Sequence, residues 1–285
     1  MTTPLRRRDE RHNHSQHGSL SSRSAAFGTL TKWLRRWPPA RCLYSVHVAT
    51  STSQVNKAGK TIRQYLANYS SVSQRDLNDA LEALVLFRSA HAYPLGKSTM
   101  GVRSVVNTNG YPIVVTQRLK MLTTIQNKLL REPGELGRMH DVGGCRAILP
   151  TVSAIYEVAQ SIEANRRRYA DVRRYDYIEQ PSESGYRSLH LVVRYPDQEN
   201  IQRRIEVQLR TPAMNRWANN VESQDRLWPG IRAGTSHPPL VDSFRQLSIV
   251  MAIQERSQNV DVESTALLER LSLAVTAYLR REGND

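Results

Sequence analysis

Residues 176–196 read DYIEQPSESGYRSLHLVVRYP, and residues 203–211 read RRIEVQLRT. In the second segment apolar residues alternate with polar ones, which is typical of a β-strand that buries one face. The polar positions hold an acid, an amide and a cation, Glu206, Gln208 and Arg210. These groups suit metal-assisted phosphate chemistry, although an ordinary edge strand with solvated polar residues has the same pattern.

Hydrophobic periodicity on both sides of these segments predicts further helices and strands. Helical spacing of apolar residues predicts helices over residues 55–66, 76–95, 151–168, 213–227, 241–256 and 262–281. Strands are expected around residue 148 and over residues 188–195 and 203–211, and residues 113–130 begin as a strand and continue as a helix.

The ends of these elements are predicted from capping and breaking residues. Asp76 is expected to cap its helix, Pro94 to end the same helix, and residues 96–112 to form a loop. Strands separated by helices, with some strands adjacent, predict an α+β domain built on a mixed sheet.

The length and the cysteine content bound the class of protein. A chain of 285 residues can bury a sizeable core without disulfides. Its two cysteines, Cys42 and Cys145, form no CxxC pair, which argues against a structural zinc site and fits a reducing compartment. No apolar run reaches membrane-spanning length and no signal peptide is visible, so we expect a soluble, cytoplasmic protein without a membrane span.

The formal net charge of +14 favours polyanionic partners. Residues 1–48 are basic, polar and without apolar periodicity, so we expect a disordered N-terminal extension before a globular domain over residues 49–285. The HNH at residues 12–14 lacks the neighbouring ligands that a metal or nuclease site needs. The basic segment FGTLTKWLRRW within this extension has three alternatives: contact with RNA, contact with anionic lipid, or weak docking on its own domain.

Two acids and a glycine pair form the first group of candidate site residues. Asp141 precedes Gly143 and Gly144, which allow a ligand to approach the backbone, and Arg146 offers a planar fork for phosphate. Two carboxylates plus substrate phosphates are a usual way to hold Mg²⁺. Asp141 together with Glu206 therefore predicts a magnesium site.

A second group of candidates precedes this motif. Arg118 and Lys120 are spaced to share one side of an extended segment, and Thr124, Lys128 and Arg131 are spaced to share one face of a helix. Four cations and a hydroxyl could then converge on a polyanion the size of a triphosphate. A solvated basic helix face is the alternative.

The segment Gly185-Tyr186-Arg187-Ser188-Leu189-His190 begins a strand after a turn that contains proline. Tyr186 could stack on a base and His190 could bond a base or a phosphate. A half-buried tyrosine and a core histidine with its own partners are the alternatives.

These segments, in this order, resemble the synthetase domain of the RelA/SpoT family. The resemblance covers about residues 118–218 and rests on RLK, TTIQNKLLR, MHDVGGCRAIL, DYIEQPSESGYRSLHLVV and IEVQLRTPAMNRWA. It implies a nucleotidyltransferase-like fold, with a mixed sheet of about five strands flanked by helices. It also implies a small, single-domain synthetase with a helical lead-in over residues 53–95, a catalytic core over 113–218 and C-terminal helices over 219–281.

The resemblance implies transfer of pyrophosphate from ATP to the ribose 3′-hydroxyl of a guanosine nucleotide, GDP or GTP, with release of AMP. Asp141 and Glu206 would hold Mg²⁺, and Glu206 would also take the proton of the attacking hydroxyl. The implied ATP-binding residues are Arg118, Lys120, Thr124, Lys128, Arg131 and Arg146. The implied acceptor-binding residues are Tyr186, which would stack on the base, with His190, Gln208 and Asn215.

Three departures from the family pattern leave other functions open. Ser182 stands where the family has a lysine for the acceptor's 5′-phosphates, Thr124 replaces a serine, and Asn219–Glu222 replace a segment with a histidine. The alternatives are a growth-arresting toxin that modifies the 3′ end of tRNA or makes adenosine alarmones, paired with an antitoxin protein, and a catalytically inactive RNA- or nucleotide-binding module.

Overall fold

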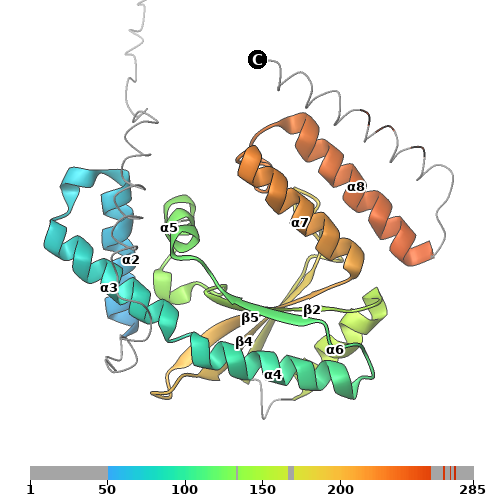
Figure 1. The fold of residues 1–285 in the computed structure, drawn as a ribbon, viewed down its shortest axis with the longest axis horizontal. Helices are drawn as coiled ribbons and strands as arrows, with labels where there is room; N and C mark the ends of the chain where they lie inside the picture. Colours follow the sequence, from blue (N-terminus) through green and yellow to red (C-terminus); the bar gives the residue numbers. More distant parts are fainter. Residues whose placement is uncertain are drawn as a thin grey trace, which may run out of the picture.

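The computed structural model describes residues 51–132, 134–165 and 170–257, together with residues 266, 270 and 273, and shows one five-stranded sheet (Figure 1). The strands are β1 (Val115–Leu119), β2 (Gly143–Ile148), β3 (Ala170–Asp176), β4 (Leu189–Pro196) and β5 (Gln202–Arg210). Their order is β1-β2-β5-β4-β3, with β2 and β5 parallel and all other neighbours antiparallel. The predicted mixed sheet of about five strands is confirmed.

The central strand β5 separates a buried face of the sheet from an open one. Its apolar residues Ile205, Val207 and Leu209 are fully buried, as their alternation predicted. Between them Glu206 faces the other side and lies opposite Gly144 of β2 in the parallel register. The glycine therefore leaves room beside the acid on the open face.

Helices α4 (Ala92–Thr108) and α6 (Val152–Ala164) cover the buried face and lie below the sheet in Figure 1. The main hydrophobic core lies between these helices and the sheet. In α6 the apolar residues of one face pack on this core. All except Val152, which is partly buried, are fully covered: Ile155, Val158, Ala159 and Ile162.

Helix α4 corrects two expectations, because Pro94 does not end a helix and residues 96–108 of the expected loop are helical. Pro94 is instead the third residue of α4. A proline is tolerated there because the first N–H groups of a helix have no acceptor within it. The helix is stabilised by Val102, Val105 and Val106, which pack on the main core. Intervening glycine, serine and threonine residues hid this pattern in the sequence.

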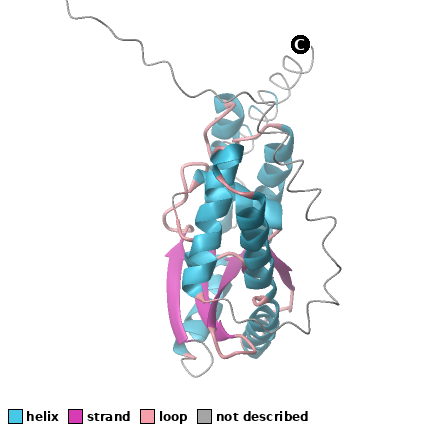
Figure 2. Ribbon diagram, turned by 90° about the vertical axis from the view of Figure 1, so that its left-hand side faces the viewer, coloured by secondary structure: helices cyan, strands magenta, loops and turns pink. Residues whose placement is uncertain are grey.

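Helices α2 (Thr52–Ala67), α3 (Gln74–Ser89) and α5 (Leu122–Arg131) pack together at one end of the sheet around a second core. Figure 2, which views the molecule from this side, shows helices in front of the strands. The side chain of Ser73 accepts the backbone N–H of Asp76, so Ser73 caps α3 and the expectation for Asp76 is wrong. In α5, Ile125 and Leu129 are buried in the second core.

Helices α7 (Pro212–Leu227) and α8 (Pro238–Ser257) stand on the open side of the sheet, opposite α5 (Figure 1). A third, smaller core joins them. Two short 3₁₀ helices, Tyr69–Ser71 and Leu136–Arg138, complete the described elements. The open face of the sheet therefore forms the floor of a space between α5 and α7.

Strand β3 was not predicted, because its ADVRRYD sequence follows a run of arginines and shows little apolar alternation. The N-terminal extension of residues 1–48 lies outside the described residues, as does nearly all of the predicted helix over 262–281. Within the part of the chain that is described, no helix is long and apolar enough to cross a membrane.

Candidate active site

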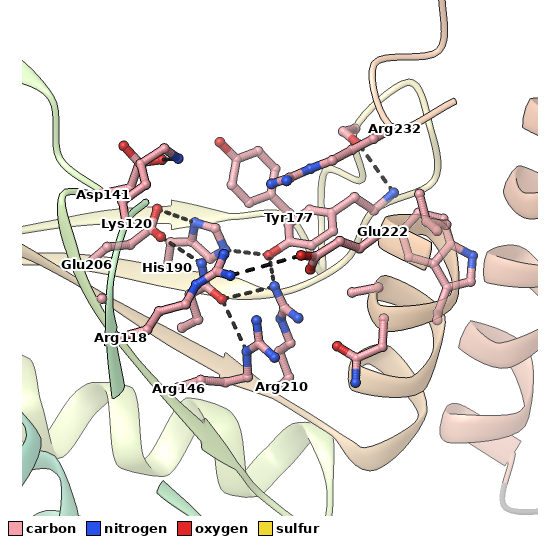
Figure 3. A pocket seen from close by; sticks show the side chains of 18 of the residues that line it. Arg118, Lys120, Asp141, Arg146, Tyr177, His190, Glu206, Arg210, Glu222 and Arg232 are labelled. Atoms are coloured by element: carbon pink, nitrogen blue, oxygen red, sulfur yellow. Dashed lines mark hydrogen bonds and ion pairs between the residues drawn. The ribbon is translucent and has the colours of Figure 1, made fainter. Parts of the chain in front are cut away.

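The open face of the sheet carries a cavity of about 590 Å³ (Figure 3). Strands β1, β2, β4 and β5 contribute to it together with α5, α7 and the loops beside them. Its lining is mostly polar and includes Arg118, Lys120, Lys128, Asp141, Arg146, Tyr177, Ser182, Tyr186, His190, Glu206, Gln208, Arg210, Trp217, Asn219, Glu222 and Arg232.

A second hollow, of about 770 Å³, adjoins the first and shares its central residues. The shared residues are Lys128, Asp141, Tyr177, His190 and Glu206. From there the second hollow extends past Met139 and His140 toward Arg63, Arg138 and Tyr175. The two acids therefore stand where two open spaces meet.

Asp141, two residues before β2, has two lysines beside its carboxylate. Its carboxylate lies 2.6 Å from Nζ of Lys120 and 3.3 Å from Nζ of Lys128. Burial acts to raise the pKa of Asp141, but the two lysines together lower it below its ordinary value. The charge of Glu206 acts in the opposite direction, which shows that the two acids are electrostatic neighbours.

Glu206 lies on β5 and accepts two hydrogen bonds from neighbouring side chains. Nδ1 of His190 lies 3.1 Å from one carboxylate oxygen, and Nε2 of Gln208 donates to the other at 2.6 Å. Burial would raise the pKa of Glu206, but His190, Gln208 and then Lys128 lower it to about 2. Glu206 is therefore ionised throughout the physiological range of pH.

These contacts close into a ring of side chains. The hydroxyl group of Tyr186 lies 2.6 Å from Nε2 of His190 and accepts a hydrogen bond from Nη2 of Arg210 at 2.7 Å. Arg210 also donates to Oε1 of Gln208 at 3.0 Å, which returns the ring to Glu206. If Nδ1 of His190 carries the proton, it donates to Glu206 while Nε2 accepts the hydroxyl proton of Tyr186. Every side chain of the ring then has a hydrogen-bond partner.

The structure brings most of the predicted site residues to this one cavity. Lys120, Lys128, Arg146 and Arg118 line it on the side of β1, α5 and β2. Arg118 is largely exposed and reaches across the cavity to within 3.9 Å of Glu222 on α7, as Figure 3 shows.

Three predicted residues do not line either hollow. Thr124 and Arg131 on α5 are outside both linings, although Lys128 of the same helix is in both. Asn215 on α7 is also outside and accepts a hydrogen bond from Nη1 of Arg146 at 3.1 Å. It contacts a predicted ATP-binding residue and therefore holds that guanidinium in place.

Sequence reasoning did not assign several residues that line the cavity. Arg210 had a usable signal, because it continues the polar alternation of Glu206 and Gln208. Its guanidinium carbon lies 5.1 Å from the ring centroid of Tyr186, a cation–π contact. Tyr177, Trp217, Glu222 and Arg232 come from a turn, a helix and a loop, where no periodic pattern marks a site residue.

The donor set fits a magnesium ion better than a metal held by protein groups alone. The described residues contain no cluster of three or more histidine, cysteine, aspartate or glutamate side chains that could hold a metal ion. Asp141 and Glu206 together match the one or two carboxylates with which proteins usually hold Mg²⁺ alongside substrate phosphates. Both are ionised and both contact cationic or donor groups, which a metal ion could replace.

The part of the chain that forms most of this cavity matches a known protein family. Residues 117–226 match the family described as "Region found in RelA / SpoT proteins". This part of the chain is therefore similar to the RelA/SpoT region. It contains β1 through α7 almost completely, and therefore the acids, the ring of side chains and most of the cavity.

Two relatives of the RelA/SpoT region come from Bacillus subtilis (strain 168). The GTP pyrophosphokinase YwaC is 36% identical over 114 residues, which are 36% of this chain and 52% of that protein. The GTP pyrophosphokinase YjbM is 37% identical over 122 residues, which are 41% of this chain and 57% of that protein. The chain thus spans about half the length of the relatives it matches.

Solved structures share the fold over a longer part of the chain. The small alarmone synthetase 1 of Bacillus subtilis, bound to its product pppGpp, has a TM-score of 0.54 and 25% identity, covering 62% of this chain and 95% of that one. A GTP pyrophosphokinase family protein from Streptococcus pneumoniae has a TM-score of 0.52 and 22% identity, covering 66% and 95%. The fold is that of a RelA/SpoT synthetase domain.

Proposed function

We propose that this protein is a pyrophosphokinase that transfers the β,γ-pyrophosphate of ATP to the ribose 3′-hydroxyl of GDP or GTP. The observation that carries the proposal is the placement of Asp141 and Glu206 together between two open spaces, with Lys120 and Lys128 beside them. Both B. subtilis relatives are named GTP pyrophosphokinases.

In the proposed reaction the 3′-oxygen of the acceptor attacks the β-phosphorus of ATP. A bond forms between that oxygen and the β-phosphorus, the bond between the β-phosphorus and the bridging oxygen to the α-phosphate breaks, and AMP leaves with the bonding electrons. The 3′-hydroxyl proton passes to the Glu206 carboxylate and from there to solvent. A carboxylate with a pKa of about 2 is a weak base, so we assign Glu206 mainly to orienting the hydroxyl and balancing charge.

The cations of β1, α5 and β2 would hold the phosphates of ATP. Phosphoryl-type transfer depends on positioning and charge neutralisation, because the protein forms no covalent intermediate. Lys120, Lys128 and Arg146 line the cavity, and Arg118 would turn from Glu222 toward the nucleotide. Thr124, in the first turn of α5, and Arg131, its last residue, remain proposed ATP contacts.

The opposite wall would bind the acceptor nucleotide. The ring of Tyr186 lines the cavity, its hydroxyl is held by His190 and Arg210, and it would stack on the acceptor base. Gln208, which contacts Glu206, and Asn215, which contacts Arg146, complete the proposed acceptor set.

Asp141 and Glu206 would hold Mg²⁺, which when bound supplies neutralisation of the phosphate charge. Lys120 and Lys128 keep Asp141 ionised, and His190 and Gln208 orient Glu206. ATP and guanosine nucleotides as substrates agree with a cytoplasmic location, which is part of the same proposal.

A second candidate function is transfer to the 3′ end of tRNA, as a toxin that an antitoxin protein would neutralise. Two observations favour it. Ser182, at the position of the family's lysine, has its hydroxyl 3.0 Å from that of Ser184 and accepts the backbone N–H of Tyr186, so it shapes a turn and carries no charge.

The second observation is a group of arginines near the second hollow, which we call the arginine edge: Arg138, Arg173, Arg194 and Arg204. Burial and then the charges of Arg194, Arg173 and Arg138 lower the pKa of Arg204, so these cations are close neighbours. Such an edge could follow the phosphates of an RNA acceptor, with release of counterions. An inactive binding module is disfavoured, because two acids in one cavity would repel phosphate without any gain.

The test is a transfer assay with ATP labelled at the β- or γ-phosphate, offered with GDP, GTP, ATP or deacylated tRNA. Label on GDP or GTP supports the leading proposal, and label on tRNA alone or on ATP supports the toxin. Arg138→Gln with Arg204→Gln should weaken transfer to tRNA and leave transfer to GDP unchanged. No transfer to any acceptor contradicts both enzyme proposals.

A further inference from the structure

Helix α8 holds the segment that carries Tyr186, although no residue of α8 lines either hollow. Ser248 donates its hydroxyl proton to the carbonyl oxygen of Gly185 at 2.6 Å, and Nε of Arg245 donates to the carbonyl oxygen of Glu183 at 2.7 Å. Gly185 has φ +86°, and a Cβ there would lie 2.9 Å from Cα of Arg245. The segment before Tyr186 therefore runs directly against the helix backbone.

Glu255, near the C-terminal end of α8, joins two positions beside the cavity. One carboxylate oxygen lies 2.7 Å from Nη1 of Arg187, in a pair whose side chains are only 13% and 6% exposed. The other oxygen accepts the hydroxyl proton of Thr211. In the chain Arg187 directly follows Tyr186, and Thr211 directly follows Arg210.

The two cavity residues that precede these partners also contact each other. Arg210 donates to the hydroxyl oxygen of Tyr186 at 2.7 Å and lies over its ring. One acid outside the cavity thus holds the side chains of the two residues that follow Tyr186 and Arg210. A buried ion pair resists rearrangement, because loss of one partner leaves the other charge buried and uncompensated.

We infer that Glu255 is a positioning residue for the acceptor nucleotide, acting through Arg187 and Thr211 on Tyr186 and Arg210. The inference rests on the proposed function and deepens it, because it connects α8 to the acceptor wall of the cavity. The proposed ATP-binding lysines lie on other elements: Lys120 follows β1, and Lys128 is on α5. Glu255 therefore affects binding of the acceptor nucleotide and leaves binding of ATP unchanged.

The experiment compares Glu255→Gln and Glu255→Asp with Glu82→Gln, which removes the same charge from an exposed position on α3. The KM for GDP and the KM for ATP are measured separately, and GDP binding is also measured by calorimetry without ATP. Glu255→Gln should raise the KM and Kd for GDP about 10-fold, by misplacing the stacking group. The KM for ATP should stay within about twofold, Glu255→Asp should lie between the wild type and Glu255→Gln, and Glu82→Gln should match the wild type.

A double-mutant cycle with Arg187→Gln separates positioning from general loosening. If Glu255 acts through Arg187, the double variant should bind GDP no more weakly than the poorer single variant. Equal rises in both KM values, or unchanged GDP affinity in folded Glu255→Gln, would overturn the inference. If the wild type transfers no pyrophosphate while Glu255→Gln still loses GDP affinity, the positioning role stands and the proposed reaction falls.

Discussion

The two faces of the sheet are built from the same strands and have opposite chemistry. On the face toward α4 and α6, Ile205, Val207 and Leu209 of β5 are fully buried aliphatic residues that pack in the main core. On the face toward the cavity, the residues between them form the ring of Glu206, Gln208 and Arg210 with His190 and Tyr186. The first face stabilises the fold because its apolar residues are removed from water. The charged groups of the second face can be partly buried because each has hydrogen-bond or ion-pair partners.

This difference means that stability and activity should be separable by changes on opposite faces of the same strand. A change on the covered face should lower the free energy of unfolding and leave the surviving folded protein active. A change on the open face should reduce activity in a protein that stays folded. Four experiments test this separation.

Glu206→Gln should have the largest effect, a loss of activity of about a thousandfold, or roughly 4 kcal/mol in the activation barrier. The amide keeps the size of the side chain and removes the charge that we assign to the reaction. The measurement is the rate of pyrophosphate transfer together with the thermal unfolding midpoint. Transfer near the wild-type rate would remove Glu206 from the mechanism.

Leu209→Ala, one residue before Arg210, should instead act on stability. Leu209 is fully buried, so its truncation should lower the free energy of unfolding by about 3 kcal/mol through lost burial and a residual cavity. Denaturant unfolding measures this loss, and transfer activity is assayed at a temperature where the variant is folded. A variant that keeps wild-type stability but loses activity would contradict the separation of the two faces.

His91, at the junction of α3 and α4, should make the free energy of unfolding sensitive to acid. Burial, followed by the charge of Arg203, lowers its pKa to about 4, although the carbonyl of Phe87 opposes this change. The unfolded chain takes up a proton near pH 6.5 and the folded one only near pH 4. The free energy of unfolding should therefore fall as the pH drops through this window, by on the order of 3 kcal/mol, with no contribution above it.

The measurement for His91 is denaturant unfolding between pH 4 and pH 7 in the wild type and in His91→Asn. The asparagine can still donate to the carbonyl of Phe87, which accepts from the ring in the wild type. The variant should lose the part of the pH slope that His91 causes. Identical slopes in the two proteins would show that another group causes the acid sensitivity.

Tyr186→Ala should have the smallest effect, a loss of acceptor affinity of about 10-fold, or roughly 1.4 kcal/mol, because one stacked base loses its platform. ATP affinity should change little. Calorimetry with GDP and with a non-hydrolysable ATP analogue gives the two values. Equal losses of both would refute the assignment of Tyr186 to the acceptor side.

Periodicity predicted the elements that have one clear apolar face. Strands β4 and β5 and helix α6 were predicted closely, because alternation and helical spacing each leave an unambiguous pattern. Helix α4 was missed because Pro94, Gly96 and Gly101 resemble loop signals, and burial beneath the sheet overrode their low propensity. Strand β3 was missed because its polar residues gave no alternation to detect.

The candidate site was predicted as a set of residues but not as an arrangement. Asp141, Glu206, Tyr186 and His190 were all assigned from their segments, and all of them line the cavity. No sequence pattern indicates that Arg210 donates to Tyr186, or that Asn215 contacts Arg146. Such contacts depend on strand register and on the direction of each side chain.

The sequence by itself determined which residues can form strands, which face of each strand is apolar, and which acids and cations are available for phosphate chemistry. These properties are local, since they depend on spacing along the chain. Only the tertiary structure decided that β2 and β5 are parallel neighbours, that two hollows meet at the acids, and that Glu255 fixes the Tyr186 segment. Those contacts join residues far apart in the chain, and they form only when the whole sheet and its helices pack together.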